Sequence, residues 1–182
     1  NAAGLAVAGS GVNVLAFSNN PDIAGNNVFI LGPTFGNTAQ RLVSYAARSG
    51  KSKIMIVNDR NIAGELGRAA VEIGAAGAGA TIVASTDYEF SQSGIVDAAS
   101  KIGDLAKSSG AQAIFLTADT AGALPMLSQL LKEQGLGGEA SQFVGLTRWD
   151  IPAATLALPG IQGGWFAMPD PSRYGQYVTR YQ

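Results

Sequence analysis

Cysteine and histidine are both absent from the 182 residues of this chain. Without cysteine it cannot form a disulfide, a catalytic thiolate or a cysteine-ligated zinc site. Without histidine it lacks the commonest general base and the commonest metal ligand, so a Ser-His-Asp triad is excluded. The carboxylates of Glu65, Glu72 and Asp97 fall on solvated helix faces and form no acid–base pair. We therefore predict a protein with no enzymatic activity, no cofactor and no metal.

Charge is scarce as well. Only 14% of the residues are charged, 12 of them basic and 13 acidic, which gives a net charge of −1. No long run of one sign is present, so the chain has no electrostatic footprint for nucleic acid or for an anionic membrane. No apolar stretch approaches the ~20 residues that span a bilayer. A basic signal segment is not visible either, and we expect any export signal to lie outside this chain.

Glycine, by contrast, is abundant, with 24 residues, and it separates short apolar runs. Four such runs lie at 53–57, 80–84, 113–116 and 143–146. The first three are each followed by a segment of helical period that ends at Gly77, Gly110 or Gly135. This alternation is typical of βαβ units whose parallel sheet is buried on both faces. The predicted fold class is α/β, a three-layer αβα arrangement with a mainly parallel sheet.

Flanking segments extend this pattern. Further strands are expected at 12–17, 27–31 and 161–167, and residues 3–9 are interpreted as the end of a helix. Asn37, Asn61 and Thr120 are predicted to cap helices, because an Asx or Thr side chain there can accept a hydrogen bond from the first helical turn. A further helix is predicted near 92–109. A last helix begins near Asp170, and its Tyr174, Tyr177 and Tyr181 share one face.

Candidate binding residues follow from the fold class. Ligands of open parallel sheets bind outside the carboxyl ends of the strands. The candidates are therefore the polar and aromatic side chains that directly follow strands: Ser18, Asn19, Asn58, Asp59, Asp119, Thr147, Arg148 and Trp149. In the last group, the guanidinium of Arg148 offers a planar donor fork for a carboxylate, and Trp149 offers an apolar platform.

Each candidate also has a purely structural explanation. The segment 18–22 reads Ser-Asn-Asn-Pro-Asp, which is favourable turn chemistry. Asp59 can stabilise the positive end of the helix that Asn61 caps. An ion pair between Arg148 and Asp150, with Trp149 packed in the core, would explain the third group. The sequence leaves both explanations open for each group.

The order of several motifs resembles a known family. Strand Val12–Phe17, the loop Ser18-Asn19-Asn20, the crossing 29–33, and strand Ile54–Val57 ending in Asn58-Asp59 resemble the Leu/Ile/Val-binding family of type I periplasmic solute-binding proteins. The likeness covers nearly the whole chain. The C-terminal motifs Thr147-Arg148-Trp149-Asp150 and 163–171 are similar to the branch of penicillin-binding-protein activator lipoproteins.

This resemblance implies two lobes, joined by a hinge, with a ligand between them. On that basis residues 1–31 are a fragment of the first lobe, 32–34 a hinge crossing, 35–162 the complete second lobe, 163–169 the return hinge strand, and 170–182 a truncated first-lobe helix. We expect a fragment of a longer protein, or one chain of a swapped or nicked assembly, with exposed apolar surface where the first lobe is incomplete.

The resemblance also implies a function. A member of the family would be periplasmic, would bind a small molecule or peptide without chemical change, and would deliver it to an ABC transporter permease. It implies a ligand contact for Ser18, whereas Ala63 stands where the family places an aromatic residue, which argues against a free branched-chain amino acid. The alternative is a lipid-anchored envelope protein that regulates a peptidoglycan synthase through protein–protein contact.

Overall fold

The protein is described here by a computed structural model that covers residues 6–7, 9–18, 20–139 and 141–181. Its centre is a five-stranded sheet in the order β4-β3-β5-β6-β7, in which every neighbouring pair is parallel. The strands are β3 (Lys53–Asp59), β4 (Thr81–Tyr88), β5 (Ala113–Leu116), β6 (Gln142–Gly145) and β7 (Trp165–Phe166). The predicted α/β class and parallel sheet are therefore confirmed.

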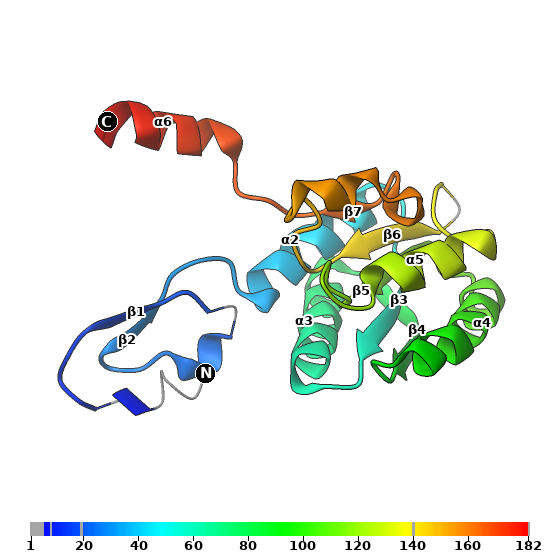
Figure 1. The fold of residues 1–182 in the computed structure, drawn as a ribbon, viewed down its shortest axis with the longest axis horizontal. Coiled ribbons are helices and arrows are strands. Elements are labelled where there is room, and N and C mark those ends of the chain that lie inside the picture. The colour runs from blue at the N-terminus through cyan, green and yellow to red at the C-terminus, as the bar shows by residue number, and fades with distance from the viewer. Residues whose placement is uncertain (1–5, 8, 19, 140, 182) are drawn as a thin grey trace.

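Helices cover both faces of this sheet (Figure 1). They are α2 (Phe35–Arg48), α3 (Ile62–Ala78), α4 (Gln92–Ser109) and α5 (Leu124–Glu133). Alternate side chains of β3 face opposite ways, as a pleated strand requires. Ile54 and Ile56 pack with α2 and α3, whereas Met55 and Val57 pack with α4 and α5. The β3 strand is thus buried on both sides, which explains its continuous apolar sequence.

Two peripheral parts lie apart from this three-layer body (Figure 1). Near the N-terminus, β1 (Val14–Ala16) and β2 (Val28–Ile30) form a separate parallel pair. The buried side chain of Asn27 holds the surrounding loop, because its Nδ2 donates to the carbonyls of Val7 and Val12, each at 2.8 Å. At the other end, α6 (Pro171–Tyr181) has no buried residue.

Both parts expose large apolar or aromatic side chains. Phe17 is 91% exposed, and the predicted tyrosine face of α6 is open, with Tyr174, Tyr177 and Tyr181 each at least 61% exposed. These exposed fractions confirm the predicted exposure of apolar surface in the two parts. The β1–β2 pair also lacks further strands, and an isolated two-stranded ribbon is marginally stable in water at best.

Helix starts differ from the sequence-based expectation in two places. The N-cap of α2 is Thr34, whose Oγ1 accepts the N–H of Asn37 at 3.2 Å, so Asn37 itself lies inside the helix. Thr120 does not cap α5, because its hydroxyl donates to the carbonyl of Ile151 at 2.7 Å and the helix begins only at Leu124. The predicted cap Asn61 is confirmed by its acceptance of the Gly64 N–H at 2.8 Å.

Element ends also shift by a few residues. Helix α3 continues past Gly77 and ends at Ala78, because the left-handed residue that closes it is Gly79, with φ of 67°. The prediction for 92–109 matches α4, which Gly110 closes in the same conformation. The strand expected at 161–167 is reduced to β7, because residues 159–161 form a one-turn 3-10 helix. Most of the helix end expected at 3–9 lies outside the described residues.

Candidate functional site

The strand order places a topological switch point between β3 and β5. From β3 the chain moves to β4 on one side, and then crosses to β5, β6 and β7 on the other. Crevices in open α/β sheets form at such a point, outside the carboxyl ends of the strands. Asp59 ends β3 here, and its backbone N–H donates to the Oγ1 of buried Thr117, which follows β5, at 3.0 Å. This bond ties the two strand ends together.

Asp59 has an unusual electrostatic environment. Burial raises the pKa of its carboxyl above the ordinary value of 3.8, the negative charge of Asp119 raises that pKa further, and a hydrogen bond from Asn61 opposes both effects. Its Oδ1 is buried and has no hydrogen-bond partner in the part of the chain that the structure describes. The two predicted aspartates are therefore close enough to interact, and one of them carries a poorly compensated charge.

Asn58, in contrast, is engaged within the protein. Its side chain is buried, and its Nδ2 donates to the carbonyl of Asp59 and to Oε1 of Glu65, both at 3.1 Å. Glu65 lies in the first turn of α3. Asn58 thus links the end of β3 to the helix that follows it, which is a structural task.

The loop after β6 brings together three of the predicted residues. Thr147 donates its hydroxyl to the carbonyl of Ala118 at 3.3 Å, which joins this loop to the one after β5. Arg148 holds Asp150 with two hydrogen bonds, from Nε to Oδ1 at 2.6 Å and from Nη2 to Oδ2. The hydrogen bond from Arg148 lowers the pKa of Asp150 below 3.8. The ion pair considered as a structural explanation is therefore present.

Trp149 lies in the core and not on the surface, with 1% of its area exposed. Its indole fills a slot between two glycines. A Cβ added to Gly145 would lie 2.2 Å from Cε2 of Trp149, and one added to Gly164 would lie 2.3 Å from its Cζ3. In this conformation Trp149 cannot serve as the ligand platform that the sequence suggested, because its ring faces Phe166 and the core.

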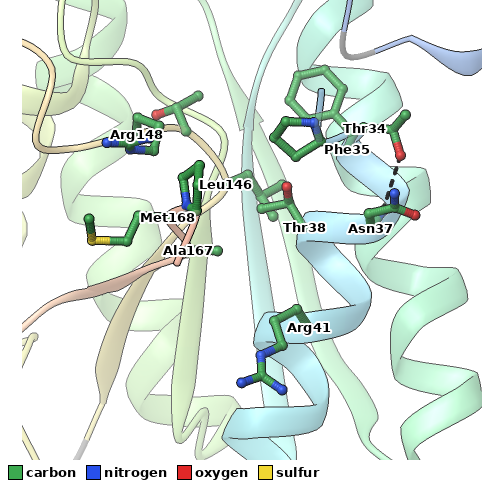
Figure 2. A pocket seen from close by; sticks show the side chains of 12 residues that line it. Thr34, Phe35, Asn37, Thr38, Arg41, Leu146, Arg148, Ala167 and Met168 are labelled. Carbon is green, nitrogen blue, oxygen red and sulfur yellow. Dashed lines mark hydrogen bonds between the residues drawn. The ribbon is translucent and has the colours of Figure 1, made fainter. Parts of the chain in front are cut away.

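A pocket of about 670 Å³ opens next to this loop, between the start of α2 and the chain that leaves β6 and β7 (Figure 2). Of the predicted site residues, Thr147 and Arg148 line it, whereas Asn58, Asp59, Asp119 and Trp149 do not. Ser18 is not part of the wall, and its Oγ accepts the N–H of Asn20 in a turn. Asn19 lies outside the described residues. The complete lining is Pro33, Thr34, Phe35, Asn37, Thr38, Arg41, Leu146, Thr147, Arg148, Ala167, Met168 and Pro169.

The contribution of α2 to this pocket was not predicted. Thr34, Phe35 and Thr38 lie along one side, with Arg41 below them on the same helix, and Arg148 and Met168 face them from the other side (Figure 2). The sequence does contain a signal for this contribution of α2. A helix that leads into a parallel strand runs against that strand, so its first turn lies at the same edge of the sheet as the strand ends. Searching only the residues after strands overlooks that turn.

The chemistry of the pocket is mainly apolar with two cations. Among the described residues, the side chain of Arg41 has no hydrogen bond or ion pair, whereas that of Arg148 is paired with Asp150. An apolar wall with one free guanidinium suits a molecule that has an apolar body and an anionic group. The described residues contain no group of His, Cys, Asp and Glu side chains that could hold a metal ion. Nor do they include a helix long and apolar enough to cross a membrane.

Comparison with protein families gives a match over the whole length. A family model described as "Periplasmic binding protein" matches residues 1–182. No protein with a curated description matches the chain.

Solved structures share its fold. A branched chain amino acid ABC transporter periplasmic ligand-binding protein from Burkholderia xenovorans has a TM-score of 0.73 at 19% identity, covering 99% of this chain and 50% of its own. An ABC transporter substrate-binding protein from Desulfitobacterium hafniense, in complex with Leu, has a TM-score of 0.68 at 22% identity, covering 85% and 44%. A solute-binding protein from R. palustris, in complex with benzoate, has a TM-score of 0.63 at 16% identity, covering 84% and 42%. The chain thus spans half or less of the length of each of these proteins.

Proposed function

Because the chain belongs to the family of periplasmic binding proteins, we propose that it forms part of an extracytoplasmic solute receptor, which binds a small molecule without changing it chemically. The ligand would then be passed to an ABC transporter permease, as the descriptions of the similar structures suggest for those proteins. Closure of two lobes around the ligand would be the mechanism.

In this proposal residues 35–162 form one lobe, and β7 of the return crossing adds the edge strand of its sheet. Residues 32–34 and 163–169 are hinge crossings, and 1–31 and 170–182 are pieces of the other lobe. The separation of β1, β2 and α6 from the body supports this division (Figure 1). So does the absence of any buried residue in α6, since an amphipathic helix normally buries its apolar face against another element.

The proposed ligand is a small organic carboxylate with an apolar body. The observation that carries this choice is the pocket at the carboxyl edge of the sheet, where the unpaired Arg41 lies below an apolar wall that includes Phe35, Leu146 and Met168. A guanidinium binds a carboxylate through two parallel hydrogen bonds. Leucine and benzoate, which occupy two of the similar structures, both contain a carboxylate. Thr147 and Arg148 would contact such a ligand from the opposite wall.

A thermal-shift screen of the full chain against aliphatic and aromatic carboxylates, each beside its neutral amide, tests this proposal. A ligand at about 100 times its dissociation constant should stabilise the protein by about 2.7 kcal/mol. Arg41→Ala should weaken binding of the carboxylate at least tenfold, because it removes the free cation. Arg48→Ala, in the last turn of the same helix and outside the pocket, is the matched control.

Two results would decide against the proposal. One is stabilisation by amides as strong as that by carboxylates, and the other is an Arg41→Ala protein that binds as tightly as the Arg48→Ala control. If no small molecule stabilises the chain and it co-purifies with a peptidoglycan synthase, the regulatory alternative would replace transport.

A further inference from the structure

The second cation of the pocket is already occupied by the protein's own carboxylate. A guanidinium carries five N–H donors, which form two forks able to grip a carboxylate. Asp150 takes the fork made by Nε and Nη2 of Arg148. The other fork, made by Nη1 and the second hydrogen of Nη2, remains for a group in the pocket. Arg148 therefore reaches the pocket with two of its five donors used and its charge balanced.

Asp150 stands behind Arg148 and does not reach the pocket. Its side chain is 19% exposed against 34% for Arg148, and only Arg148 belongs to the pocket wall. A ligand would consequently meet the guanidinium and not the aspartate. Any influence of Asp150 on a ligand must pass through Arg148 or through the field of its negative charge.

The loop holds this pair in place. Trp149, between the two residues, is fixed in its slot by Gly145 and Gly164. Directly after Asp150, the carbonyl of Ile151 accepts a hydrogen bond from Thr120 at 2.7 Å. The chain is thus anchored on both sides of Asp150, and the two hydrogen bonds from Arg148 orient its carboxylate. Asp150 therefore balances the charge of Arg148 beside the pocket.

We propose that Asp150 is a positioning residue that sets the charge preference of the pocket: it aims the free fork of Arg148 while it weakens the attraction of that side for anions. This inference rests on the proposed function, since it concerns the same pocket. It narrows the ligand class beyond the small organic carboxylate proposed above. The pocket should take a molecule with one carboxylate, held by Arg41, whose opposite end is neutral and hydrogen-bonds to Arg148. Any carboxylate that approaches Arg148 would lie close to Asp150 and would be repelled, so a monocarboxylate such as benzoate gains from Arg148 only when the charge of Asp150 is removed.

The test compares benzoate with benzamide, which has a similar shape and no charge, by isothermal titration calorimetry on the full chain. Asp150→Asn keeps the size of the side chain and removes its charge. Removing a neighbouring negative charge at a partly exposed site raises the affinity for an anion by about tenfold. We therefore expect Asp150→Asn to bind benzoate about tenfold more tightly than the original protein, with benzamide binding unchanged within about twofold. Asp97→Asn, an exposed position on α4, is the matched control and should change neither.

A second variant shows whether the gain passes through Arg148. Arg148→Met in the Asp150→Asn background should remove the gain for benzoate. If Asp150→Asn does not fold, Asp150→Ser provides the same loss of charge with a smaller side chain. A benzoate affinity that stays unchanged or undetectable in the charge-removed protein overturns the inference, as does an equal gain for benzamide, which would indicate a merely structural effect.

The failure of this inference is separable from failure of the proposed function. If the original protein binds carboxylates through Arg41 but Asp150→Asn has no effect on benzoate, the inference alone is wrong. If the original protein binds no carboxylate and Asp150→Asn acquires benzoate binding, the inference holds and the proposed ligand class is wrong.

Discussion

Replacing Gly145 by alanine tests the slot that fixes the site loop. The added Cβ would lie 2.2 Å from Cε2 and 2.3 Å from Nε1 of Trp149, far inside van der Waals contact. The indole cannot retreat, because Gly164 confines its other edge. Overpacking of a core costs about 1–3 kcal/mol, and we expect Gly145→Ala to fall at the upper end, near 3 kcal/mol. For a chain of this length that corresponds to a loss of roughly 6–12 °C in the unfolding midpoint.

Two comparisons isolate the steric cause, with calorimetry or circular dichroism as the assay. Gly77→Ala makes the same substitution in α3, where nothing lies within 4 Å of the new Cβ, and it should stabilise the protein by roughly 0.5–1 kcal/mol. Combining Gly145→Ala with Trp149→Leu should cost less than the sum of the two single changes, because the smaller side chain leaves room for the methyl. An unchanged midpoint for Gly145→Ala, or strictly additive costs, would refute the reasoning.

Two further predictions concern charge and capping. Because burial and Asp119 raise the pKa of Asp59, its ionised form penalises the folded state. This penalty is complete above the raised pKa and disappears as the pH falls to about 3.8. Asp59→Asn should therefore stabilise the protein at pH 7 and lose that advantage near pH 4. A stability advantage of Asp59→Asn that stays constant in urea titrations across this pH range would contradict the prediction. Thr34→Ala should cost about 1 kcal/mol by removing the cap of α2, whereas Asn37→Ala should be nearly neutral, and equal costs in thermal unfolding would show that the cap is misassigned.

The extent of α4 shows what local sequence can determine. Its apolar residues repeat at helical spacing, and Gly110 closes it in a left-handed conformation that glycine adopts without strain. Both signals lie within the helix or next to it. The start of α2 shows the limit of such signals, since Thr34 and Asn37 are both good capping residues and lie three positions apart. Only the tertiary position of the helix decides between them.

The site depends on contacts between distant parts of the chain, which a single sequence does not display. The burial of Trp149 is decided by Gly145 and Gly164, one before the loop and one well after it. The pocket joins Arg41 to Arg148, which are more than a hundred residues apart. The sequence predicted that Thr147 and Arg148 follow a strand at the correct edge, but it could not show which side chains face them from α2.

The uniform direction of the five strands gives the sheet two chemically different rims. Ser52, directly before β3, is exposed on the rim opposite the strand ends, whereas Asn37 is exposed within the pocket wall. Because the chain contains no cysteine, one introduced cysteine would be its only thiol. A fluorophore on Asn37→Cys would therefore sense the arrival of a solute, and the same dye on Ser52→Cys would serve as a silent reference. The parallel sheet thus makes this protein a ready scaffold for a ratiometric optical sensor.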